Sequence, residues 1–216
     1  MSRFPDEPES KIIGGEPISI ESLPSAVQFF NFGSLCSGTI INSWSILTAA
    51  HCFDQNKDVY DMVIQVGARY TYDNDAEIHR VLEFIIHSNY SKEMPFACDI
   101  ALVFYGGPIS DSGLLKTYLE FIPKEKCEKM HNLKFTSDMF CLYGDGVRDT
   151  CKGDSGGGVI WNDTVVGIVS HGAGCSNKNK PSIYSNVWYF RNWIKKEISK
   201  FFKNFCSQYN RLINME

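Results

Sequence analysis

Short apolar runs, broken by glycine, asparagine, aspartate and proline, make up most of this chain. Between residues 12 and about 189 these runs are short and rich in β-branched and aromatic side chains. Runs of four to eight such residues between turn residues favour β-strands. The expected strands are 26–30, 39–41, 45–49, 62–66, 81–86, 100–105, 116–122, 158–161, 165–170 and 183–187. The polar residues 162–163 between two of these runs predict a hairpin turn.

Helical periodicity first appears near the C-terminus. Apolar residues recur there at helical spacing, while lysines occupy the other face of the expected helix. The apolar set is Ile194, Ile198, Phe201, Phe202 and Phe205, and the lysines are Lys195, Lys196, Lys200 and Lys203. Such a helix either packs on the body of the protein or lies on a membrane surface. We expect packing, and no earlier helix longer than a turn or two, which makes the chain all-β with a C-terminal helix.

Composition excludes several classes of protein. The 216 residues are 44% hydrophobic and 21% charged, a globular balance that suits one ordinary domain or two small ones. The net charge is −4, with 21 basic and 25 acidic residues and no prominent basic cluster. This argues against nucleic acid as the main partner. No apolar run approaches the roughly 18 residues of a membrane span, so we expect no membrane partner. We also expect a monomeric protein.

Eight cysteines are a high number for a cytosolic protein of this size. They lie at 36, 52, 98, 127, 141, 151, 175 and 206, without a Cys-x-x-Cys pair. An even number with wide spacing indicates a disulfide framework and an oxidising compartment, so we expect a secreted protein. The first ten residues hold no hydrophobic segment that could direct secretion. Either the signal lies outside this sequence or the sequence begins at the wrong place.

Three motifs together support one chemistry. They are LTAAHC at 47–52, CDIAL at 98–102 and DTCKGDSGG at 149–157. A serine hydroxyl is a poor nucleophile without an adjacent base. His51 could take the proton of Ser155, and Asp99 could hold the imidazole in the required tautomer. The backbone N–H groups of Gly153 and Ser155 could stabilise an oxyanion. Taken singly, the first motif is more typical of a structural histidine and the second of a capping or turn aspartate, and the third could be a flexible loop.

The combination resembles the chymotrypsin-like serine proteases of the trypsin branch, peptidase family S1, from about residue 11 to 194. The resemblance implies two antiparallel β-barrels, the first at about 12–109 and the second at about 114–190. It also implies a pro-segment at 1–11, a C-terminal helix and tail at 191–216, and no cofactor. Some members of the family have a calcium loop, but Ala68 stands where its first carboxylate is expected. We therefore predict an exposed acidic loop there and no metal.

The resemblance also implies activation by cleavage. Cutting after Lys11 would free the α-amino group of Ile12, which would fold inward and pair with Asp154. Taken alone, Lys11–Gly15 (KIIGG) is more typical of a strand followed by a turn.

By the same resemblance, Asp149 lies at the bottom of the primary specificity pocket and selects Lys or Arg. Ser170 and Gly172 belong to the strand that binds the substrate backbone, and Gly172 and Ser182 line the pocket. The family usually carries glycine at the position of Ser182 and tryptophan at that of His171. We therefore expect a narrower pocket that favours Lys over Arg.

The resemblance implies three disulfides: Cys36–Cys52, Cys127–Cys141 and Cys151–Cys175. Cys98 and Cys206 remain. They either pair with each other, stay as free thiols or form an intermolecular bond.

One segment departs from the family. Only 56 positions separate Asp99 from Ser155, and the family usually has roughly forty more residues there. The linker between the barrels and the first strand of the second barrel fall in that gap, so we expect an incomplete second barrel. The predicted function is a serine endopeptidase that cleaves after Lys or Arg, with protein or peptide substrates and protein protease inhibitors as partners. The alternatives are an inactive or misfolded truncated or splice variant, or a non-catalytic homologue that acts by binding.

Overall fold

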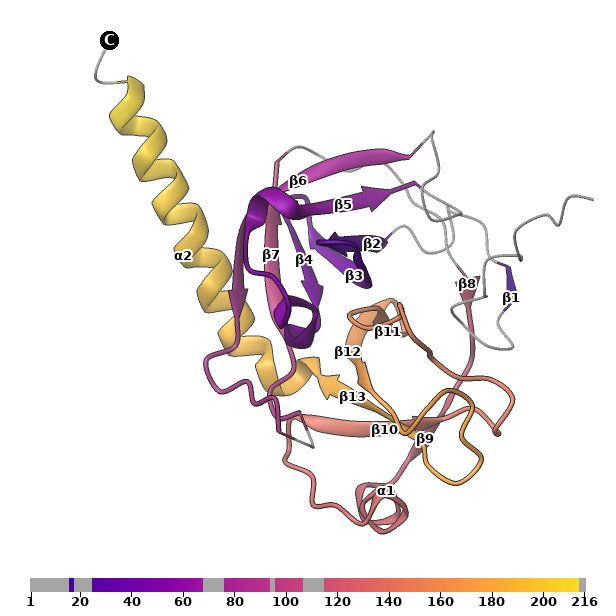
Figure 1. The fold of residues 1–216 in the computed structure, drawn as a ribbon. Coiled ribbons are helices and arrows are strands. Elements are labelled where there is room, and N and C mark those ends of the chain that lie inside the picture. Colours follow the sequence, from indigo (N-terminus) through magenta and orange to yellow (C-terminus); the bar gives the residue numbers. More distant parts are fainter. Residues whose placement is uncertain (1–15, 18–24, 68–75, 94–95, 107–114, 214–216) are drawn as a thin grey trace, which may run out of the picture.

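The computed structural model describes residues 16–17, 25–67, 76–93, 96–106 and 115–213 (Figure 1). Six antiparallel strands of the N-terminal half form a closed barrel in the order β2-β3-β4-β7-β6-β5. They are β2 Ala26–Asn31, β3 Ser34–Asn42, β4 Ser45–Thr48, β5 Met62–Val66, β6 Glu77–Ile86 and β7 Ala101–Tyr105. Two 3-10 turns, η2 Ala50–Phe53 and η3 Val59–Asp61, lie between β4 and β5. Alternate strand residues such as Phe29, Ile46, Ile64 and Val103 fill the barrel interior.

The C-terminal half forms a curled sheet of five antiparallel strands in the order β11-β12-β13-β10-β9. They are β9 Glu120–Ile122, β10 Met139–Tyr143, β11 Gly158–Trp161, β12 Thr164–His171 and β13 Ser182–Asn186. Within the described residues this sheet does not close, which confirms the prediction of an incomplete second barrel. A separate two-stranded ladder joins β1 Glu16–Pro17 to β8 Leu115–Lys116. The hairpin β11–β12 turns at Asn162 and Asp163, both with positive φ, as a type I′ turn requires.

Helix α2, Val187–Ile213, follows β13 and runs along the outside of the closed barrel (Figure 1). Its apolar stripe packs against β4, β7 and β12, where Phe201 stacks on Phe104 with ring centroids 3.8 Å apart. Ile194 is buried in the same cluster. The stripe is therefore used for packing, as predicted. Among the described helices none is long and apolar enough to cross a membrane.

Several expectations about local structure were wrong. Helix α1, Lys124–His131, was not predicted, because Cys127 is its one buried residue and no apolar stripe marks it. Strand β10 was missed, although MFCLY has the length and composition of a strand. The run 116–122 is not one strand: Tyr118 is exposed, and only Glu120–Ile122 joins the curled sheet. Helix α2 begins at Val187, earlier than the expected boundary at 191.

Candidate active site

Neighbouring strands of the closed barrel bring His51 and Asp99 together. His51 lies in η2, which begins two residues after the end of β4, and Asp99 lies two residues before the start of β7. Strands β4 and β7 are antiparallel partners, with Thr48 opposite Ala101, so the end of one strand meets the start of the other. Asp99 Oδ2 lies 2.8 Å from His51 Nδ1, and Asp99 Oδ1 accepts the backbone N–H of His51 at 2.9 Å. Both carboxylate oxygens therefore hold the His51 residue.

Asp99 is buried, with 1% of its surface exposed. Burial alone would raise the pKa of its carboxyl, but the hydrogen bond and charge of His51 and the hydrogen bond from Ser170 Oγ keep that pKa below its usual value. Burial lowers the pKa of His51. The hydrogen bond and negative charge of Asp99, together with the charge of Asp54, raise it by more than burial lowers it. The pKa of His51 is raised above 6.5 as a result. The ionised carboxylate thus favours the imidazolium.

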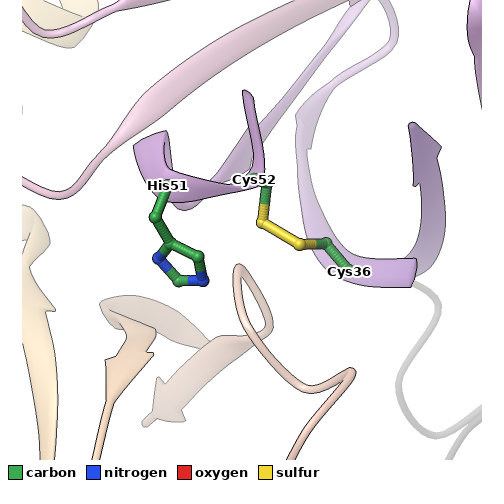
Figure 2. A group of neighbouring side chains, drawn as sticks. All are labelled: Cys36, His51 and Cys52. Carbon is green, nitrogen blue, oxygen red and sulfur yellow. A yellow bond between two sulfur atoms is a disulfide. The ribbon is translucent and has the colours of Figure 1, made fainter. Parts of the chain in front are cut away.

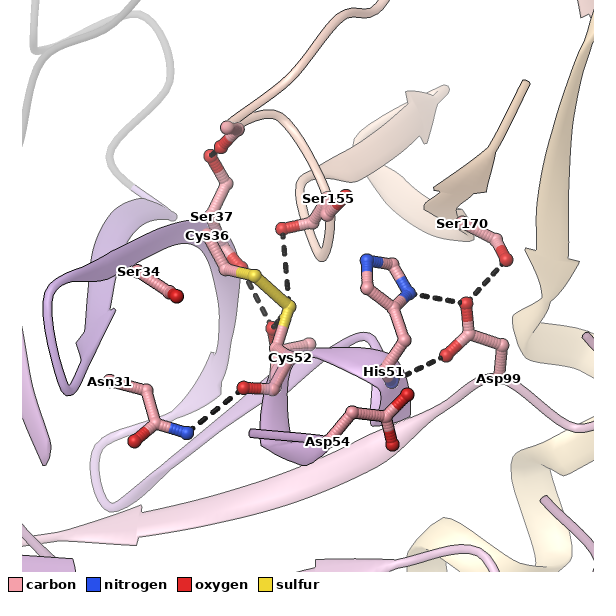
Figure 3. The surroundings of a disulfide bond; sticks show 12 residues. Asn31, Ser34, Cys36, Ser37, His51, Cys52, Asp54, Asp99, Ser155 and Ser170 are labelled. Atoms are coloured by element: carbon pink, nitrogen blue, oxygen red, sulfur yellow. Dashed lines mark hydrogen bonds and ion pairs between the residues drawn. A yellow bond between two sulfur atoms is a disulfide. The ribbon is translucent and has the colours of Figure 1, made fainter. Parts of the chain in front are cut away.

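Ser155 is held in a tight loop before β11, on the other half of the molecule. Gly156 has φ +88°, and a Cβ there would come within 2.1 Å of the Ser37 carbonyl oxygen. The Ser37 N–H donates to the Ser155 carbonyl oxygen at 2.7 Å. The loop therefore rests directly on β3. Figure 3 shows the His51 ring between Asp99 on one side and Ser155 on the other.

The backbone around Ser155 leaves two donors available. Within the described part of the chain, the N–H groups of Gly153 and Ser155 make no hydrogen bond. Gly153 has φ +94°, and its carbonyl oxygen accepts Ser37 Oγ at 2.9 Å. That carbonyl belongs to the Gly153–Asp154 peptide between the two donors, and the N–H of the same peptide donates to the Cys151 carbonyl oxygen at 3.1 Å. Two such N–H groups beside a serine hydroxyl are suited to an oxyanion.

Comparison with known proteins identifies the family of this chain. The family model described as Trypsin matches residues 12–112 and 104–194. The chain belongs to the trypsin family. It is a serine-type endopeptidase.

Curated trypsins align with most of this chain. It is 30% identical over 227 residues to Trypsin epsilon of Drosophila erecta, with 87% of this chain and 88% of that protein covered. Trypsin I-P1 of Gallus gallus is 28% identical over 90% of this chain and 92% of its own length. Trypsin of Sus scrofa is 28% identical over 91% of this chain and 99% of its own length.

Asp149, the residue that the trypsin family resemblance assigns to the specificity pocket, is buried and multiply hydrogen-bonded. Its Oδ1 accepts the Thr150 N–H and the Ser182 hydroxyl, both at 2.8 Å, and its Oδ2 accepts the Ser176 N–H at 2.8 Å. A Cβ on Gly172 would lie 3.0 Å from Ser182 Oγ. The structure therefore places Asp149, Gly172 and Ser182 together, with the Ser182 side chain between the other two.

Three disulfides are present: Cys36–Cys52, Cys127–Cys141 and Cys151–Cys175. The last closes the segment that carries Asp154 and Ser155. The two sulfurs of the first and a ring nitrogen of His51 lie within 4.8 Å of one another (Figure 2). Because the sulfurs are bonded to each other, neither is a thiolate that could bind a metal. The disulfides fit a protein of an oxidising compartment.

Cys98 and Cys206 are both free thiols, so the pairing alternative is wrong. Cys98 is buried, and its N–H donates to Asp138 Oδ2 at 2.6 Å. Cys206 is exposed on the far part of α2.

Sequence reasoning missed an aromatic contact beside His51. Phe96 stacks on His51 at 6.1 Å and meets His171 edge-on at 4.8 Å. His171 Nδ1 lies 2.9 Å from Ser170 Oγ. Because the Ser170 hydroxyl gives its single proton to Asp99, His171 must donate in this pair. Burial lowers the pKa of His171 to about 4, so it is neutral at pH 7. No motif in the sequence signals this contact, because it depends on how the loop before Asp99 meets β12.

Lys11 and Ile12, and most of the acidic loop with Ala68, lie outside the described residues. Asp154 is buried, and its Oδ2 accepts the Cys151 N–H at 2.8 Å.

Proposed function

We propose that this protease uses Ser155 as nucleophile, His51 as general base and Asp99 as the group that orients the base. The carrying observation is the 2.8 Å contact between His51 Nδ1 and Asp99 Oδ2. This contact holds the proton of the neutral imidazole on Nδ1 and leaves Nε2 as a base toward Ser155 (Figure 3). These roles are those of the known serine-protease triad.

The reaction follows from this arrangement. Nε2 of His51 takes the Ser155 proton as Oγ attacks the scissile carbonyl carbon, and the N–H groups of Gly153 and Ser155 stabilise the oxyanion. The imidazolium then gives its proton to the leaving amine, which leaves an acyl group on Ser155. A water molecule, deprotonated by the same nitrogen, hydrolyses that ester and releases the acid.

The substrates are polypeptides with Lys or Arg before the scissile bond. The support is the buried Asp149 carboxylate, since the ammonium or guanidinium of such a substrate residue would donate a charge-assisted hydrogen bond to it. Ser170 and Gly172 at the end of β12 would pair with the extended substrate backbone. Protein protease inhibitors that present such a segment would bind the same surface.

The enzyme is made as a secreted zymogen and activated by cleavage after Lys11. The burial of Asp154 next to Ser155 supports this, because the freed Ile12 ammonium would give that carboxylate an opposite charge. A buried charge that loses its partner costs about 3–5 kcal/mol. The three disulfides support an extracellular location.

The test is covalent labelling of the activated protein. The purified chain is cleaved after Lys11, treated with a fluorophosphonate and weighed intact, with Ser155→Ala as the matched control. One adduct that maps to Ser155 and is lost in the control supports the proposal. Soluble, correctly cleaved protein that takes no adduct would overturn it and support a binding function. Aggregation of the cleaved protein would support the truncated-variant alternative, which the comparisons do not favour.

A further inference from the structure

Charge is distributed very unevenly between α2 and the rest of the chain. The helix carries six cationic residues and one acidic residue, a charge of +5, in a chain whose net charge is −4. The cations are Arg191, Lys195, Lys196, Lys200, Lys203 and Arg211, and the acid is Glu197. The rest of the molecule is therefore strongly acidic, and α2 is a basic surface on it.

Three of the lysines form one stripe on the solvent side of α2. Lys196, Lys200 and Lys203 are spaced i, i+4 and i+7, so they share a helix face and span about 10 Å along the axis. All three are exposed, and with Ser199 and Asn204 they line a shallow surface hollow. We call these three residues the lysine stripe.

The stripe is poorly neutralised by the protein itself. Glu197 is largely buried and approaches Lys200 at 3.8 Å, at the limit of an ion pair. Among the described residues, no acidic group pairs with Lys196 or Lys203. Three ammonium groups in a row repel one another, and an anionic partner would relieve that repulsion.

We propose that the lysine stripe binds a linear sulfated polysaccharide. A lipid surface is a poorer partner, because the apolar stripe of α2 is largely packed against β4, β7 and β12. Of the exposed aromatic residues of the described helix, Trp188 and Tyr189 lie in the first turn and Phe205 about four turns later, so they form no continuous apolar face for insertion. The disulfides fit an oxidising compartment. The choice of a sulfated polysaccharide over a nucleic acid rests on the secretion proposed above. Lysine ammoniums are point charges that suit a flexible chain of sulfates without fixed geometry.

The location leaves the catalytic residues accessible. Helix α2 runs along the outer side of the closed barrel, whereas His51 and Ser155 face each other between the two halves (Figures 1 and 3). A bound polyanion would therefore concentrate the protease on a matrix without blocking its site.

The test measures heparin binding of the full chain at several salt concentrations. The charge-reversed protein Lys196→Glu, Lys200→Glu, Lys203→Glu is compared with Lys124→Glu, Lys126→Glu, Lys129→Glu. This control makes the same charge change at three exposed lysines of α1. We expect the first triple to bind at least tenfold more weakly, with a slope of log K against log salt lower by about one per lysine. The control should bind like the parent.

Equal losses in both triples, or no parent binding at low salt, would overturn the proposal. Parent binding to phosphatidylserine vesicles in place of heparin would also overturn it. If the first triple fails to fold, by circular dichroism, the corresponding triple of glutamines takes its place. Because binding is measured without turnover, the result is independent of whether Ser155 is active.

Discussion

The Ser182 hydroxyl donates a hydrogen bond to Asp149 Oδ1 at 2.8 Å. That oxygen also accepts the Thr150 N–H, so it has little capacity left for a substrate. A guanidinium needs both carboxylate oxygens for its bidentate contact, whereas an ammonium can use one.

We therefore expect kcat/KM for a Lys peptide to exceed that for the matched Arg peptide. Ser182→Gly should shift the ratio toward Arg by about tenfold, within the 1–3 kcal/mol that a small pocket change is worth. Ser176→Gly is the control, because its side chain bonds Val147 and only its backbone N–H reaches Asp149. Turnover by the parent that is equal or favours Arg would contradict the expectation.

The contact between His171 and Ser170 extends the hydrogen-bond chain that holds Asp99. In His171→Phe the ring against Phe96 is kept and the Nδ1–H donor is lost. One neutral hydrogen bond is worth about 1 kcal/mol, so we expect kcat to fall up to about tenfold. Ser170→Ala removes the charge-assisted bond to Asp99 itself and should cost more. A larger loss in His171→Phe than in Ser170→Ala would show that His171 acts in another way.

The acid limb of the pH profile should follow His51. The general base works as neutral imidazole, and its raised pKa places the half-maximal kcat/KM above pH 6.5. The charge of Asp54 contributes to that rise by stabilising the imidazolium. In Asp54→Asn the imidazolium loses this stabilisation, so the limb should move to lower pH with the plateau retained. Asp163→Asn, in the exposed β11–β12 turn, should leave the limb in place.

The two thiols should differ sharply in reactivity. Cys206 is exposed, whereas burial and then the nearby Asp138 raise the pKa of Cys98 to about 11. A disulfide reagent at pH 8 should therefore titrate one thiol per native molecule and two after denaturation. Cys206→Ser should reduce these values to none and one. No titratable thiol in either state would mean that the two cysteines are bonded after all.

The sequence predicted the all-β class from local patterns, and the barrels only through the resemblance that three short motifs carry. Apolar runs located most strands, and three short motifs contained His51, Asp99 and Ser155. Helix α1 has no such pattern, since Cys127 is its one buried residue and ties it to β10 through the Cys127–Cys141 bond. The raised pKa of the Cys98 thiol could not be predicted from the sequence either, because it depends on burial and on where Asp138, 40 positions away, lies in the fold.

The open second sheet has a consequence for how activity is lost on heating. Each strand of the closed barrel has two neighbours, whereas β9 and β11 have one each within the described residues. A strand with one neighbouring strand opens locally at a lower free energy than a strand with two, so its amide hydrogens exchange with solvent faster. His51 and Asp99 adjoin strands β4 and β7 of the closed barrel, which we expect to exchange slowly, and Ser155 lies three residues before β11. Hydrolysis should therefore be lost at a temperature below the melting of the barrel, since Ser155 is displaced while His51 is still held in place.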